Sequence, residues 1–193
     1  MVKNSDHAGN KKPSVREIRA QKILLAAQTL FAQQGFRPVT MENIAAAAGI
    51  AKATLYAYFS DKDVIFKAVA KLTVKRMEHG FLHALAEEAP LIEKVSAALI
   101  AKHRVTYDLV RTSQHAAELF ATKNRLIGTL FSDMDEVLIE HIAQQIDDEF
   151  ALKEALKISR VLFHASLGIA NGIADIHEVE NGINMMVRGI LQH

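Results

Sequence analysis

The chain has 193 residues, half of them hydrophobic, and it contains no cysteine. Disulfides, thiolate metal sites and cysteine nucleophiles are therefore excluded, and the apolar content is sufficient for a sizeable core. The net charge is +1, and only three prolines and nine glycines interrupt a sequence rich in Ala, Leu, Ile, Glu and Lys, which favours an all-helical fold.

The charges are unevenly placed along the chain. Residues 1–62 hold nine Lys or Arg and four acidic residues, which gives +5, whereas the remaining residues carry −4. A basic head on an acidic body suits a module that binds a polyanion, joined to one that does not. Chance clustering is the alternative, because basic tails are common.

The first 13 residues are polar and basic, and we expect them to form a disordered arm. This start lacks the apolar core of a signal peptide, and no apolar run approaches the length of a membrane span. We therefore expect a cytoplasmic protein with no membrane partner.

Three helices are expected next, and together they form a predicted head domain over residues 14–62. Ser14 begins the first helix with a capping-box pattern, and Gly35 ends it. Thr40 is placed to cap the second helix, which Gly49 stops. The third helix is expected from about residue 51 to 59.

The strongest functional signal lies in residues 40–59, which are typical of two helices joined by a tight turn. Ala45 allows the helices to approach closely, Gly49 can adopt the positive φ of the turn, and Leu55 points inward. These residue types at this spacing predict a helix-turn-helix, whose second helix fits a DNA groove.

Residues 63–193 are predicted to form a helical body that binds an effector and dimerises. Its first helix is expected to run to about His79, where Gly80 weakens it. Pro90 suits the first turn of the next helix, which is expected to reach about Arg111.

The C-terminal part of the body completes an expected total of about nine helices. Ser113 and Thr122 are expected to cap two of them, and the last two are expected over about 150–176 and 178–191. The penultimate helix is apolar over most of its circumference, apart from a narrow polar stripe that ends at Asp175. We therefore predict a homodimer through the last two helices, with a central helix inside a monomer as the alternative.

Several motifs in residues 14–69 occur together: Leu30-Phe31-Ala32, Gly35-Phe36, Ile44-Ala45, Ala48-Gly49-Ile50 and Thr54-Leu55-Tyr56-Ala57-Tyr58-Phe59, with Lys62 following. With these motifs the sequence resembles the TetR/AcrR family of bacterial regulators over about residues 14–69. The resemblance implies an all-helical dimer, with a three-helix head that binds DNA and a body that binds a ligand and dimerises. The family often has Ser or Thr at the position of Ala51 and a larger residue at that of Ala57.

The outward face of the predicted recognition helix is narrow and largely apolar. Ala53 and Ala57 point most directly outward and favour contact with thymine methyl groups. Lys52 is the candidate for guanine O6 and N7, and Thr54 can reach a base or a phosphate. A half-buried structural role is the alternative for each tyrosine. Resemblance and geometry together predict phosphate contacts by Thr40, Tyr56, Tyr58 and Lys62.

The body suggests a ligand pocket, because polar side chains enter an apolar helix face at four-residue spacing. His103 and Tyr107 can hydrogen-bond a polar ligand, and Arg111 can meet a carboxylate or phosphate. His164 and Asn171 are further candidates for the lining. The alternatives are a structural buried histidine and solvated positions for the other residues.

Metal and catalytic sites are not predicted. His79 and His83 have the i, i+4 spacing of zinc ligands, but no third ligand is evident. The sequence contains no glycine-rich phosphate loop and no catalytic constellation.

We interpret the chain as a ligand-responsive repressor that binds a pseudo-palindromic DNA operator as a dimer. Its effector is an unknown small molecule, and no cofactor is expected. The alternatives are a DNA-binding regulator without a small-molecule effector and, from another class, a helical enzyme.

Overall fold

The computed structural model describes residues 14–108, 113–147 and 152–192. The predicted arm over residues 1–13 lies outside the described residues. Within them the fold is all-helical, as predicted. The helices are α1 (Val15–Gln34), α2 (Met41–Ala48), α3 (Lys52–Tyr58), α4 (Lys62–Leu85), α5 (Leu91–Thr106), α6 (Ala116–Ile127), α7 (Leu130–Ile146), α8 (Leu152–Gly172) and α9 (Ile176–Leu191).

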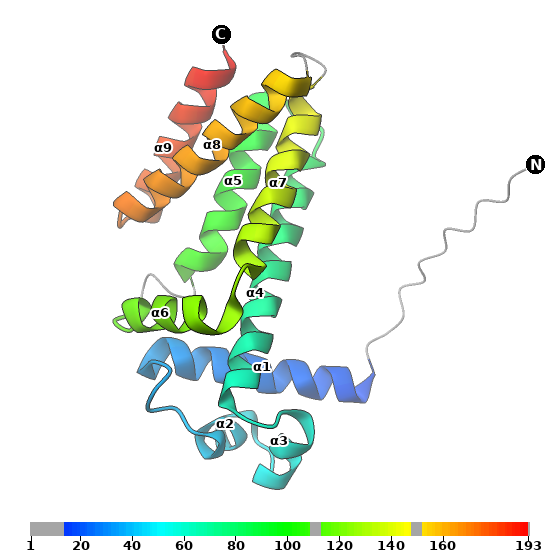
Figure 1. Cartoon of the computed structure of the whole chain (residues 1–193), viewed down its shortest axis with the longest axis vertical. Helices are drawn as coiled ribbons and strands as arrows, with labels where there is room; N and C mark the ends of the chain where they lie inside the picture. The colour runs from blue at the N-terminus through cyan, green and yellow to red at the C-terminus, as the bar shows by residue number, and fades with distance from the viewer. Residues whose placement is uncertain (1–13, 109–112, 148–151, 193) are drawn as a thin grey trace, which may run out of the picture.

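The first three helices form a head at one end of the molecule (Figure 1). α1 lies across the end of the body, α2 and α3 lie beyond it, and the long α4 runs from the head into the body. Ile23, Ile44 and Leu55 are fully buried at the centre of the head. Phe66 of α4 and Leu119 of α6 pack into the same core. The core of the head therefore extends beyond residue 62, and helices of the body contribute to it.

Local sequence signals set the helix ends of the head. The Ser14 hydroxyl accepts a hydrogen bond from the Glu17 amide at 3.2 Å, and the Ser14 amide donates to the Glu17 carboxylate at 2.7 Å. Thr40 forms the same reciprocal arrangement with Asn43. Gly49 adopts the left-handed conformation, with φ of 65° and ψ of 39°, as expected for the turn.

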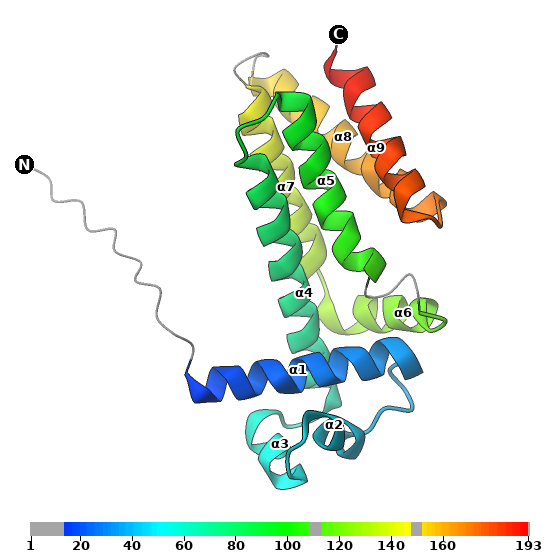
Figure 2. The ribbon, with the colours of Figure 1, turned by 180° about the vertical axis from the view of Figure 1, so that it is seen from behind.

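The body is a bundle in which α4 packs along α5 and α7, and α9 packs against α5 and α8 (Figure 2). Its core is aliphatic and aromatic, with Phe81, Leu99, Ile142, Phe163 and Ile183 fully buried. Burial of such side chains contributes about 1.5–3 kcal/mol each. No helix in the described part of the chain is long and apolar enough to cross a membrane.

The expected end of α4 near His79 is wrong, because the helix continues through Gly80 to Leu85. A glycine inside a helix costs about 1 kcal/mol. Phe81 and Leu85, both buried in the body core beside this glycine, offset that cost. α5 is α-helical to Thr106, and its expected end near Arg111 lies outside the described residues.

Thr122 does not cap a helix, because it is buried in the interior of α6. Instead, the chain turns at Gly128, which has a φ of 60°, and α7 starts two residues later. Ser113 lies just before α6, where its hydroxyl accepts a hydrogen bond from the His115 amide at 3.0 Å and donates to the Ala32 carbonyl of α1. This contact ties the start of α6 to the head.

Asp175 does not continue the polar stripe of α8 as predicted. α8 ends at Gly172, and the Asp175 carboxylate caps the next helix. It accepts hydrogen bonds from the amides of His177 at 2.7 Å and Glu178 at 3.1 Å. An acidic cap here also interacts favourably with the positive end of the α9 dipole.

Candidate DNA-binding surface and cavity

α3 presents a small exposed face at the end of the head. Leu55 is fully buried against the head core, whereas Lys52, Ala53, Tyr56 and Ala57 are exposed. Helical periodicity places Ala53 and Ala57 opposite the buried leucine, and Lys52 and Tyr56 flank them. The face therefore offers a cation, a phenol and two methyl groups to a partner.

Lys52 is already paired in this structure. Its ammonium forms an ion pair with Glu42 of α2, which raises the pKa of the lysine and lowers that of the carboxyl group. The ammonium also lies 5.9 Å from the centroid of the Tyr56 ring. Glu42 was not among the predicted site residues, because its approach to Lys52 depends on how α2 and α3 pack.

The start of α3 has the backbone of a cap but no capping side chain. Ala51 is extended, with φ of −67° and ψ of 146°, and makes no side-chain hydrogen bond. Ser, Thr, Asp or Asn at such a position accepts a hydrogen bond from an amide in the first turn. The amides in the first turn of α3 are therefore left for water or for an anion.

Three further predicted DNA contacts are partly buried or already hydrogen-bonded within the head: Thr40, Thr54 and Tyr58. Thr54 and Tyr58 are half-buried, and the guanidinium carbon of Arg16 lies 5.6 Å from the centroid of the Tyr58 ring. The Thr40 hydroxyl is exposed but donates to the Asn43 side chain at 2.8 Å while it caps α2. Arg16 adds a cation beside the predicted DNA-binding face.

The structure does not present Lys62 as a phosphate-binding group. Its ammonium donates hydrogen bonds to the carbonyls of Phe36 at 2.8 Å, Arg37 at 3.0 Å and Val39 at 2.7 Å. It also lies 4.4 Å from the centroid of the Phe36 ring, and burial lowers its pKa. All three ammonium hydrogens are used, so the geometry assigns Lys62 to holding the loop before α2.

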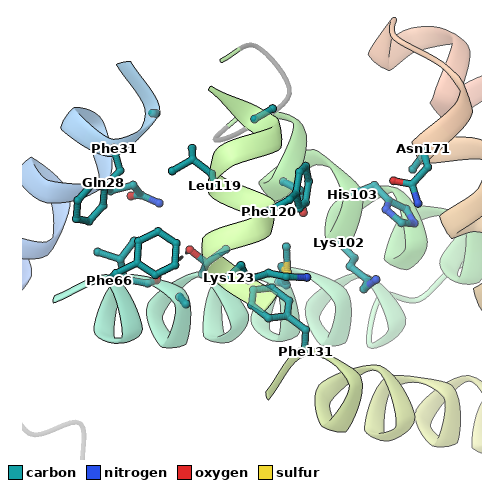
Figure 3. Close-up of a pocket in the computed structure, with 18 of the residues that line it drawn as sticks. Gln28, Phe31, Phe66, Lys102, His103, Leu119, Phe120, Lys123, Phe131 and Asn171 are labelled. Carbon is teal, nitrogen blue, oxygen red and sulfur yellow. Dashed lines mark hydrogen bonds between the residues drawn. The ribbon is translucent and has the colours of Figure 1, made fainter. Parts of the chain in front are cut away.

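A cavity of about 580 Å³ lies between the head and the body (Figure 3). Its wall is shared by α1, α4, α5, α6, α7 and α8. Most of the lining is apolar or aromatic, which is typical of sites for small molecules. The lining residues are Gln28, Phe31, Ala32, Phe66, Val69, Ala70, Thr73, Met77, Lys102, His103, Thr106, Ala116, Leu119, Phe120, Lys123, Phe131, Asp135, Leu167, Ala170 and Asn171.

His103 lines this cavity and is held in a defined tautomer. The Ser166 hydroxyl donates its single hydrogen to the Phe163 carbonyl at 2.7 Å, so it accepts from Nε2 of His103 at 3.0 Å. Nδ1 is then an acceptor. Burial, with a smaller contribution from the charge of Lys102, lowers the pKa of His103 to about 3, so the ring is neutral at physiological pH.

Lys102 and Asp135 form an ion pair at the cavity wall that the sequence analysis did not identify. Their charged atoms are 3.2 Å apart, and the lysine is almost completely buried. Burial lowers the pKa of Lys102, while the charge of Asp135 opposes that shift. The sequence places Lys102 directly before His103, but it does not show that Asp135 lies opposite, because Asp135 is on a different helix.

The other residues predicted to line a pocket differ in whether they contact this cavity. Asn171 lines the cavity together with His103. Tyr107 and His164 are not part of the lining of this cavity, and His164 is exposed on α8. Helical periodicity turns His164 away from the buried Phe163 side. Arg111 lies outside the described residues.

The two histidines of α4 do not assemble a metal site in the described part of the chain. The rings of His79 and His83 are 6.3 Å apart, and the second ring lies 3.3 Å from the Glu87 carboxylate. No group of three His, Cys, Asp or Glu side chains capable of holding a metal ion occurs among the described residues.

Comparison with known proteins places this geometry in a family. Residues 23–69 match the model of the tetR family of bacterial regulatory proteins. The uncharacterized HTH-type transcriptional regulator YhgD of Bacillus subtilis (strain 168) is 28% identical over 135 residues, which cover 67% of this chain and 68% of that protein. The uncharacterized HTH-type transcriptional regulator Rv1255c of Mycobacterium tuberculosis (strain ATCC 25618 / H37Rv) is 30% identical over 122 residues, or 63% and 58% of the two chains.

The fold is also shared with solved structures. A crystal structure of a TetR-family transcriptional regulator from Mesorhizobium loti superposes with a TM-score of 0.70, at 18% identity over 93% of this chain and 98% of that one. Its likeness concerns the fold of head and body together, whereas the family model matches the head and the start of α4. Residues 23–69 thus match the TetR family of bacterial regulatory proteins, and the relatives and the shared fold support a DNA-binding transcriptional regulator of that kind.

Proposed function

We propose that the chain is a ligand-responsive repressor that binds a pseudo-palindromic operator as a homodimer. The main support for this proposal is that residues of both the head and the body line the cavity. Phe31 and Ala32 of α1 line it from the head, and His103 and Leu167 line it from the body. A small molecule in this cavity touches both parts and can favour one arrangement of the head over another.

The coupling has a definite energetic requirement. A hundredfold loss of DNA affinity requires the effector to favour the non-binding arrangement by about 2.7 kcal/mol. Gln28 and Phe31 give the effector direct contact with α1, and Phe66 gives it contact with the segment of α4 that packs in the head core. These contacts can supply a differential affinity without a relay through intervening residues.

The exposed face of α3 supports reading of DNA in the major groove. Its small methyl groups permit close approach and contact with thymine methyls. The Lys52 ammonium can leave the Glu42 carboxylate and donate hydrogen bonds to a guanine instead. Because its ammonium holds backbone carbonyls of the head, Lys62 is no longer part of the proposed contacts. The proposed contact residues are Thr40, Lys52, Ala53, Thr54, Tyr56, Ala57 and Tyr58.

The outer faces of α8 and α9 support a dimer interface. Val161 is 56% exposed and Met185 is 76% exposed, which is unusual for large apolar side chains. A Cβ added at Gly168, Gly172 or Gly189 would meet nothing within 4 Å, so these positions also face open space. Apolar and small residues on two adjacent helices permit the close approach of a symmetry-related pair.

Selection of bound DNA from a random pool, with the full chain, tests the first part of the proposal. We expect a two-fold symmetric sequence whose half-sites are about 34–36 Å apart or a multiple of that distance. Binding should weaken steeply as salt is raised. Recovery of no preferred sequence, or of single half-sites only, would refute the operator model.

Two substitutions test the role assigned to the start of α3. Lys52→Ala should reduce affinity for the selected operator by about tenfold and relax the preference at one base pair. Glu42→Gln should strengthen binding to all sequences by several-fold, because it removes a carboxylate that competes with DNA for Lys52. Quantitative gel shifts measure both, and unchanged affinity in both variants would contradict this docking.

Cavity filling tests the effector part and the alternative of an effector-free regulator. A small-molecule library is screened for compounds that stabilise the wild-type chain and release it from the operator. Ala170→Phe, which fills the cavity wall, should abolish that release while operator binding remains. Ala117→Phe, at an exposed position of α6 outside the lining, is the control. Release that is equal in both variants favours an effector site elsewhere.

A further inference from the structure

The charges that line the cavity do not cancel. Among the described lining residues, Lys102 and Lys123 are basic and Asp135 is acidic. His103 is neutral at physiological pH because its pKa is lowered to about 3. The lining therefore carries a net charge of +1 in a mostly apolar site.

Among the residues that the structure describes, the lining cation without a paired carboxylate is Lys123 of α6. Asp135 lies within 3.2 Å of Lys102, so these two charges offset each other. No carboxylate of the described residues forms an ion pair with Lys123. The positive charge of Lys123 also lowers the pKa of Lys102. Among the described residues, therefore, no anionic group pairs with the Lys123 ammonium in the cavity.

Aromatic rings hold the Lys123 ammonium inside the cavity. The nitrogen lies 4.8 Å from the centroid of the Phe131 ring and 5.8 Å from that of Phe120. Figure 3 shows the side chain between Phe66 on one side and His103 on the other. A cation in a partly desolvated, aromatic setting attracts an anion more strongly than one in bulk water.

The two sides of the cavity differ in chemistry. Toward the head the lining is mostly apolar, with Phe31, Phe66, Val69 and Leu119, and Gln28 is an uncharged polar residue there. A molecule that satisfies both the ammonium and these side chains needs a single negative charge and an apolar part.

We infer that the effector is an amphipathic monoanion, a carboxylate joined to an apolar chain or ring. Its carboxylate binds the Lys123 ammonium, and its apolar part lies against Phe31 and Phe66 at the junction with the head. This inference rests on the proposed function for the role of effector, but the binding chemistry stands on the cavity alone. One molecule can thus bind Lys123 in the body through its carboxylate and contact α1 of the head through its apolar part.

Three probes with the same alkyl chain and different head groups test the inference: octanoate, octanol and octylammonium. Isothermal titration of the full chain should show octanoate binding about tenfold more tightly than octanol, and octylammonium binding least. Lys123→Gln should reduce octanoate affinity by about tenfold and leave octanol affinity unchanged. Lys123→Arg should restore the preference for the acid.

Lys71→Gln is the matched control, because it removes the same charge from an exposed position outside the lining. It should bind octanoate as the wild type does. Equal affinity for octanoate and octanol, tighter binding of octylammonium, no binding of octanoate, or an unchanged preference in Lys123→Gln would each overturn the inference. A misfolded Lys123→Gln variant is recognised by lost octanol binding, and the head-group comparison in the wild type then decides.

The outcome for DNA separates this inference from the proposed function. If octanoate binds with the expected preference but leaves operator affinity unchanged, the chemistry of the site holds and the repressor model fails. If an uncharged library compound releases the operator while octanoate does not bind, the repressor model holds and the inference fails.

Discussion

Three lysines of this chain acquire different chemistry from their surroundings. Lys52 is exposed and pairs with Glu42, Lys62 donates to three carbonyls, and Lys102 is buried beside Asp135. Resemblance and local helix geometry predicted the same phosphate-binding role for Lys62 as for the tyrosines of α3. The distinction depends on which carbonyls and carboxylates the tertiary structure places within reach of each ammonium.

Lys62→Met should destabilise the protein rather than selectively weaken DNA binding. The substitution keeps most of the apolar stem but leaves three carbonyls without their charged donor, which costs about 1–3 kcal/mol. Urea denaturation measures the change, and Lys67→Met, at an exposed position of α4, is the control. A Lys62→Met variant of full stability with impaired operator binding would restore the phosphate role.

The neutral His103 ring makes stability depend on pH. The ordinary pKa of 6.5 applies to the unfolded chain, whereas the folded pKa is about 3. Between these values the unfolded chain binds a proton that the folded protein does not, so the free energy of unfolding decreases as pH falls. From pH 7 to pH 5 this contribution is about 2 kcal/mol.

His103→Gln should reduce that loss, because glutamine does not titrate. Urea denaturation at pH 7 and pH 5 gives the difference for each variant, and His79→Gln, at an exposed position of α4, serves as the control. The control should retain the decrease seen in the wild type. The assignment would be wrong if His103→Gln lost as much stability as the wild type over the same interval.

At the scale of elements, α3 shows how a short helix can be formed mainly by its neighbours. It spans Lys52–Tyr58, lacks a side-chain cap, and buries only Leu55 completely. Isolated helices of this length are marginal in water. Packing of Leu55 against Ile44 and Ile23 in the head core therefore supplies the stability that the sequence of α3 does not.

Ala51→Ser should stabilise the protein by about 1 kcal/mol, because the backbone is already extended at this position and serine can accept an amide hydrogen bond. Thermal denaturation measures the gain. Ala57→Ser is the control, since the same side chain in the interior of α3 has no free amide to cap. Equal melting temperatures for the two variants would contradict the capping argument.

At the scale of the whole molecule, the proposed function depends on how two copies, each with a head and a body, are arranged. The head core takes Phe66 from α4 and Leu119 from α6, so the body cannot move without affecting the head. The exposed Val161 and Met185 lie on the two helices proposed to join the copies. In the proposed function, a few packed helices would connect the effector, the head and the partner subunit.

Met185→Glu should convert the proposed dimer into a monomer, because it places a charge in the proposed apolar interface. Light scattering after size-exclusion chromatography measures the mass, and operator affinity should fall by about tenfold or more once one half-site is lost. Leu25→Glu, at another exposed apolar position on α1, should remain dimeric. A dimeric Met185→Glu variant would place the interface elsewhere.

The helical class and the helix-turn-helix were predictable from the sequence because their signals are local. Capping by Ser14 and Thr40, the turn at Gly49 and the burial of Leu55 each depend on residues within a few positions of one another. The misplaced cap at Thr122 and the expected end near Gly80 were wrong where tertiary packing outweighed local preference.

The cavity and its charges were decided only by the tertiary structure. Lys102 meets Asp135 across 33 positions of sequence, and His103 meets Ser166 across 63. Periodicity can place a side chain on a face of its own helix, but it does not say which helix lies opposite. The sequence therefore determined a DNA-binding head, while the packing of α1 and α4–α8 determined where a ligand can touch it.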